Sequence, residues 1–167
     1  MHTLYHDWIG FIHLQAALIA LTSGTLVLWM RKGTRKHTQV GYLYTASMLI
    51  VFITSFLIYR LWGSFGIFHI AAIIGFLTLM GGMVPVILKK PIGKWIGLHY
   101  SFMYWSVIGL YAAFVSETLT RIPDTPFYGM LGISTFGVMI AATIGFNRYQ
   151  KVWKSKFMPD KKELTSH

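Results

Sequence analysis

The sequence contains no cysteine. Disulfides, thiolate-bound zinc, iron–sulfur clusters and cysteine nucleophiles are therefore excluded. Charged residues are also scarce, at 12% of the 167 residues, whereas a soluble domain carries about 25%. Hydrophobic residues reach 54%. This composition excludes a soluble enzyme and an intrinsically disordered chain.

Acidic residues are the scarcest charged type, with 5 Asp and Glu against 15 Lys and Arg and a net charge of +10. None of these four residue types occurs inside five apolar runs, and each run has the length of about 20 residues that crosses a bilayer. The runs are residues 8–30, 40–59, 65–88, 96–115 and 127–146. We therefore predict an all-α integral membrane protein with five transmembrane helices.

The joints between the runs are short, so neighbouring helices are expected to be antiparallel. The predicted fold is an up-and-down four-helix bundle core plus one additional helix. Residues 1–147 form this single bundle, and residues 148–167 form a basic tail. The fifth helix is expected to pack on the core or to form a contact in a homodimer.

The basic residues gather on one side of the predicted bundle. Thirteen of the 15 fall in the joint 31–36, in the joint 89–94 or after residue 147. The positive-inside rule then places the N-terminus outside and the C-terminus in the cytoplasm. The positive charge accordingly indicates orientation and contact with membrane lipid, and no nucleic-acid partner is expected.

Four histidines lie at the ends of the first four runs. His13 and His69 are near the outer ends of the first and third runs, and His37 and His99 are near the inner ends of the second and fourth. In an up-and-down bundle each pair lies on diagonal helices at a matching depth, so it can offer two imidazoles to one metal. Residues 10–14 also echo residues 66–70, which is typical of a tandem duplication.

Two imidazoles without thiolate or carboxylate suit a low-spin b-type haem. The sequence therefore predicts two haem b groups, an outer one held by His13 and His69 and an inner one held by His37 and His99. Zinc would need four ligands, and copper is the less favoured alternative. Candidates for contacts to the haem propionates are Arg35, Lys36 and Lys94 on the inner side, and Arg60 or Arg121 on the outer side. The small residues beside these histidines also serve plain helix packing, and the histidines themselves fit interfacial positions in a bundle without a cofactor.

The first basic joint and later segments resemble a family of small bacterial membrane proteins known as a domain of unknown function. The similarity covers about residues 10–120. It implies a protein of the bacterial cell membrane but does not indicate which activity the protein has. It rests on Lys32-Gly33-Thr34-Arg35-Lys36-His37, Gly41-Tyr42, Tyr44, Phe68-His69, His99-Tyr100 and Tyr111-Ala112-Ala113-Phe114.

The predicted architecture resembles the ascorbate-linked dihaem cytochrome b reductases. Those proteins have a four-helix core and two bis-histidine haems, and they move electrons across the membrane to ferric iron or another acceptor. The resemblance implies that His13 and His69 match the ligand pair of one membrane face, and His37 and His99 that of the other. The chain shows no ascorbate-site motif, so the donor stays open between a quinol and a cytoplasmic reductant.

The sequence thus predicts a dihaem b-type membrane cytochrome, a transmembrane oxidoreductase of the ferric or quinone-linked reductase kind. Electrons would pass from a quinol or cytoplasmic donor to an outer acceptor such as ferric iron. Two alternatives remain open. One is a membrane subunit or assembly factor without a cofactor, and the other is a haem or metal carrier that transfers no electrons.

Overall fold

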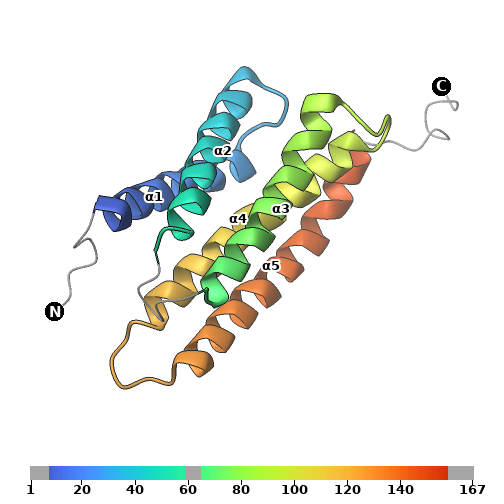
Figure 1. Ribbon diagram of the computed structural model, residues 1–167. Coiled ribbons are helices and arrows are strands. Elements are labelled where there is room, and N and C mark those ends of the chain that lie inside the picture. The colour runs from blue at the N-terminus through green and yellow to red at the C-terminus, as the bar shows by residue number, and fades with distance from the viewer. Residues whose placement is uncertain (1–7, 59–64, 158–167) are drawn as a thin grey trace, which may run out of the picture. The chain divides into compact units, whose positions relative to one another are not determined.

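The computed structural model describes residues 8–58 and 65–157, and in this part of the chain all the regular secondary structure is α-helix (Figure 1). The all-α class is therefore confirmed for the described residues. Tyr59, where the second run was predicted to end, Arg60 and the tail from residue 158 lie outside them. The helices are α1 (Trp8–Trp29), α2 (Arg35–Ser55), α3 (Ile67–Leu88), α4 (Trp95–Leu119) and α5 (Phe127–Phe157).

The described residues belong to two compact units. The first unit ends at Leu79 and contains α1, α2 and the first part of α3, and α1 packs along α2. The second unit begins at Met80 and contains the end of α3, α4 and α5, and α4 packs along α5. The four-helix core predicted from the sequence combines helices of both units, and it stays a prediction.

Side chains of the joint between α1 and α2 cap the end of α1 and the start of α2. Lys32 Nζ donates to the carbonyl oxygens of Val27 at 2.6 Å and Leu28 at 2.8 Å, so it satisfies two acceptors at the end of α1. Gly33 follows with a φ of +76°, a conformation that glycine adopts without strain. Thr34 then caps α2 by accepting a hydrogen bond from the His37 backbone N–H at 3.1 Å.

Within residues 8–58 and 65–157, four helices are long and apolar enough to cross a membrane: α1, α3, α4 and residues Phe127–Trp153 of α5. The chain is therefore a multi-pass membrane protein. The second predicted span differs, because α2 begins with polar residues and ends at Ser55. Its apolar part, residues 40–55, is about 24 Å long, whereas the hydrocarbon core measures about 30 Å. The count of five spans is thus not confirmed.

The last helix is longer than the apolar run predicts. It continues to Phe157, because residues 147–157 contain no glycine or proline that would end it. Trp153 also contacts α4, with ring centroids 5.0 Å from Tyr100 and 6.0 Å from Tyr104. The predicted division between bundle and tail at residue 147 is therefore not a helix end.

The contact between α4 and α5 contains buried hydroxyl groups. Tyr104 donates from its hydroxyl to the Ala142 carbonyl at 2.7 Å, and a Cβ at Gly145 would lie 3.0 Å from this hydroxyl. Further along, the Ser116 and Ser134 hydroxyl oxygens are 2.8 Å apart. The fifth helix therefore packs on α4, one of the two arrangements expected for it, and a homodimer contact stays a prediction.

Replacing Tyr104 with phenylalanine removes the hydroxyl that joins α4 to α5. We expect the free energy of unfolding to fall by about 1 kcal/mol, because one hydrogen bond is lost and the Ala142 carbonyl stays buried. Unfolding by dodecyl sulfate in bicelles measures this change. Tyr149→Phe is the matched control, since the Tyr149 side chain is 59% exposed. Equal effects of the two substitutions would show that the hydroxyl contact is not stabilising.

Candidate functional site

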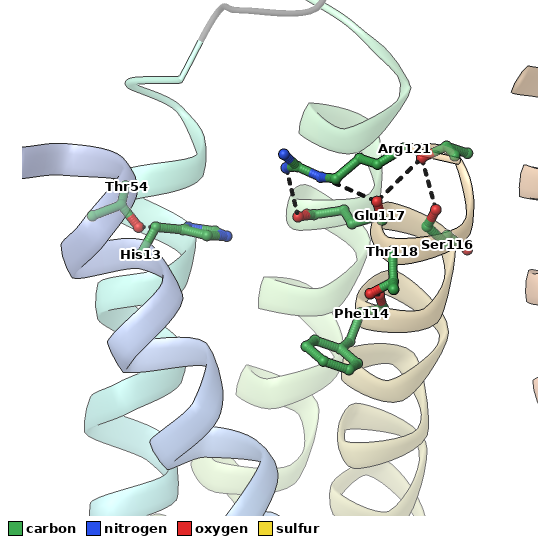
Figure 2. Close-up of polar contacts among 8 residues, drawn as sticks. His13, Thr54, Phe114, Ser116, Glu117, Thr118 and Arg121 are labelled. Atoms are coloured by element: carbon green, nitrogen blue, oxygen red, sulfur yellow. Dashed lines mark hydrogen bonds and ion pairs between the residues drawn. The ribbon is translucent and has the colours of Figure 1, made fainter. Parts of the chain in front are cut away.

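His13 is held by a hydrogen bond between α1 and α2. Its Nδ1 lies 2.8 Å from Thr54 Oγ1 (Figure 2). Thr54 Oγ1 donates its own hydrogen to the Ile50 carbonyl at 2.7 Å. It must therefore accept from His13, whose Nδ1 carries the hydrogen. A neutral His13 then has its lone pair on Nε2, the form in which histidine binds metals.

His99 has the same hydrogen-bond pattern in the second unit. Its Nδ1 lies 2.9 Å from the Gly82 carbonyl oxygen, and because a carbonyl can only accept, Nδ1 carries the hydrogen. Pro85 lies one turn further along α3 and lacks the amide hydrogen that would pair with the Gly81 carbonyl, next to the carbonyl that His99 contacts. The sequence interpretation did not find this role, although Gly-Gly followed by proline inside an apolar run is a visible signal.

His69 has the opposite pattern. It is buried, with 6% of its surface exposed, and its Nδ1 accepts a hydrogen bond from the Gly66 backbone N–H at 3.0 Å. The His69 backbone N–H donates in turn to the Gly66 carbonyl at 3.0 Å. The contact from the His69 side chain to the Gly66 N–H is one half of a capping box at the start of α3, and glycine has no side chain to supply the other half. A neutral His69 therefore carries its hydrogen on Nε2, and coordination through that atom would require breaking the contact with Gly66.

His13 and His69 lie at the same end of the first unit. His13 contacts Thr54 in the last turn of α2, and the His69 ring centroid is 6.0 Å from that of Phe56, just beyond that turn. Phe65 stacks on His69 with centroids 4.9 Å apart. The expectation that both histidines lie near one end of the helices therefore agrees with these contacts, and their binding of one metal stays a prediction.

His37 lies at the other end of α2, where it is half-buried. It belongs to the first unit and His99 to the second, so their pairing stays a prediction from the sequence. The three inner propionate candidates, Arg35, Lys36 and Lys94, are all exposed. Within residues 8–58 and 65–157 no group of three or more His, Asp and Glu is placed to hold a metal ion, although a bis-histidine site does not need such a group.

Of the two outer propionate candidates, Arg60 lies outside the described residues and Arg121 already has a partner. An Arg121 nitrogen is 3.8 Å from a Glu117 carboxylate oxygen, and Arg121 Nε donates to the Glu117 carbonyl at 3.1 Å (Figure 2). Arg121 would have to leave this exposed ion pair to reach a propionate. Such pairs contribute only about 0–1 kcal/mol.

Residues 10–14 and 66–70 are similar in sequence, but the histidines within them, His13 and His69, have different environments in the structure. Gly10 lies inside α1, whereas Gly66 precedes α3 and caps it. As a result His13 donates through Nδ1 to another helix, while His69 accepts through Nδ1 from its own helix start. A glycine three residues before a histidine predicts this cap only when the helix begins between them.

Lys32 is half-buried under the end of α1, and burial lowers its pKa from 10.5 to about 8. At pH 8 about half of Lys32 is therefore neutral, against roughly 0.3% for a lysine with the ordinary value. We expect amine-directed acetylation of Lys32 to rise with pH around a midpoint near 8, measured by mass spectrometry with the exposed Lys36 as internal reference. A midpoint at 10.5 would refute this expectation. Because the unfolded chain binds more protons than the folded one between these two values, stability rises with pH over the same window.

Residues 10–149 match the profile of a family described as "Predicted membrane protein (DUF2306)". The chain belongs to this family. The match contains all four predicted haem ligands and confirms the resemblance to a membrane-protein family of unknown function. No curated protein and no solved structure matches the chain.

Proposed function

We propose that this family member is a dihaem b-type cytochrome of the bacterial cell membrane. It passes electrons from a quinol or cytoplasmic donor to an outer acceptor such as ferric iron. One observation carries the proposal: Nδ1 of His13 lies 2.8 Å from Thr54 Oγ1 and Nδ1 of His99 lies 2.9 Å from the Gly82 carbonyl oxygen, the kind of contact that orients a metal-binding imidazole. The orientation with the N-terminus outside follows from the basic joints.

Under this proposal His13 and His69 hold the outer haem, and His37 and His99 hold the inner one. Arg35, Lys36 and Lys94 would contact the inner propionates. Haem b supplies one-electron redox chemistry when bound. The chain orients the ligands through two hydrogen bonds, from His13 to Thr54 and from His99 to the Gly82 carbonyl. Such bonds fix the ring and raise the basicity of the coordinating nitrogen.

His69 fits the proposal less directly than His13 does. It becomes a ligand only if the hydrogen on Nε2 moves to Nδ1 and the contact with Gly66 is released. The loss of one such hydrogen bond costs about 1 kcal/mol. A loss of that size does not prevent His69 from serving as a ligand.

A membrane subunit or assembly factor without a cofactor is the second candidate, and the cap formed by His69 favours it. In that case His69 serves only to begin α3. His69→Gln separates the two candidates, since glutamine can accept from the Gly66 N–H but provides no imidazole. The cofactor-free candidate predicts an unchanged protein, whereas the haem proposal predicts loss of outer haem with unchanged helix content.

Thr54→Val keeps the shape of the side chain and removes the oxygen that accepts from His13. We expect haem affinity at the outer site to fall 10–100-fold, the usual effect of losing a hydrogen-bond partner of a metal ligand. Titration of the purified protein with haem, followed by absorption, measures this change. Thr54→Ser is the control and should retain the affinity, because it restores the hydroxyl. Equal affinities of the valine and serine variants would contradict the role assigned to Thr54.

Electron transfer itself is tested in liposomes that hold the protein and enclose a ferric chelate. With a quinol supplied outside, we expect iron reduction well above the rate of protein-free liposomes, and this excess should disappear in His13→Ala and in His99→Ala. Bound haem without any excess rate would leave the carrier alternative and refute transmembrane transfer.

A further inference from the structure

Three exposed cations lie in the joint between α1 and α2 and in the first turn of α2. Arg31, Arg35 and Lys36, here called the cationic triad, lie within six residues, and the surface of each is open to solvent. Lys32 is not one of them, since its ammonium group is half-buried and donates to two carbonyls at the end of α1. This segment therefore contains one cation that is hydrogen-bonded within the protein and three cations that are exposed to solvent.

The cationic triad has no carboxylate counterion among the described residues of its own unit. The sequence contains no Asp or Glu from residue 8 to residue 116, so the described part of the first unit has none. Arg121 in the second unit shows the contrast, because it pairs with Glu117. The described residues of the first unit thus offer the cationic triad no negative charge, and an anion from another molecule can neutralise it.

The depth of the joint indicates which molecule that is. Trp29 ends α1 two residues before Arg31, and its side chain is 86% exposed. Tryptophan at the end of an apolar helix is typical of the headgroup layer of a membrane. Arg31 follows Trp29 after one residue, so we expect the cationic triad to lie near the lipid phosphates.

We propose that the cationic triad binds the phosphate of an anionic phospholipid headgroup. Guanidinium groups match phosphate oxygens with paired N–H donors, and the Lys36 ammonium adds a third charge. The proposal is independent of haem. Each cation near an anionic lipid surface contributes roughly 1 kcal/mol. The affinity is expected to fall about fivefold for each charge removed, and on the order of 100-fold for all three.

The test titrates the full-length protein in neutral detergent with phosphatidylglycerol and, separately, with phosphatidylcholine, and native mass spectrometry counts the bound lipid. We expect tighter binding of phosphatidylglycerol and loss of this preference in the triple variant R31Q/R35Q/K36Q. R31K/R35K keeps the charges and should keep most of the preference. K32Q should leave the preference unchanged, because Lys32 is already bound to α1.

Single substitutions keep the test valid if the triple variant does not fold, since R35Q alone should weaken phosphatidylglycerol binding about fivefold. Circular dichroism in phosphatidylcholine confirms equal folding of the compared variants. Phosphatidylglycerol affinity that is the same in R35Q and in the unchanged protein overturns the proposal. Full competition by an equal concentration of inorganic phosphate overturns the assignment to a lipid headgroup.

Discussion

Gly82→Val is expected to disrupt the packing of α3 on α4 and to lower the free energy of unfolding by about 3 kcal/mol. A Cβ at this position would lie 2.8 Å from Met103 Sδ and 3.2 Å from the Met103 backbone nitrogen. The sulfur can move, but the backbone nitrogen is fixed within α4. The same change also shifts the carbonyl that accepts from His99. Unfolding by dodecyl sulfate in bicelles measures the loss.

Two other glycines provide controls for this prediction. A Cβ at Gly81 would lie 2.8 Å from the Phe102 ring, but that side chain is 38% exposed and can rotate away, so Gly81→Val should destabilise less. A Cβ at Gly109 meets nothing within 4 Å, and Gly109→Val should change stability least. A Gly82 variant as stable as the Gly109 variant would refute the close contact between α3 and α4.

His13→Ala and His99→Ala are each expected to remove one of two haems from the protein. The absorption band of reduced b-type haem should fall by half in each variant and vanish in the double variant, because an axial ligand is lost at each site. His167→Ala, at the C-terminal position of the sequence, is the matched control and should leave the band unchanged. Retention of the full band in both single variants would rule out these histidines as ligands.

The apolar runs predicted several helix ends correctly and missed those that polar side chains determine. The starts of α1 and α5 and the end of α3 fall where the runs begin or end. The start of α2 does not, because Thr34 caps a first turn made of polar residues that an apolarity criterion leaves out. Hydropathy therefore located the four helices that are long and apolar enough to cross a membrane, whereas capping by Thr34 set the start of α2.

The histidines were identified by their spacing, but their hydrogen bonds could not be. The partner of His13 is 41 residues away along the chain, and that of His99 is a backbone carbonyl 17 residues away in another helix. Both depend on tertiary contacts that no local pattern encodes. His69 is the instructive exception, because a local cap gives it the proton arrangement that disfavours coordination, despite its sequence echo of His13.

Haem content per chain tests the central claim most directly. The protein, expressed with ample haem and purified in mild detergent, is examined by quantitative absorption and by electron paramagnetic resonance. The proposal predicts two low-spin, bis-imidazole haems for each chain. A folded but colourless protein, or one whose haem lacks bis-imidazole ligation, would contradict it.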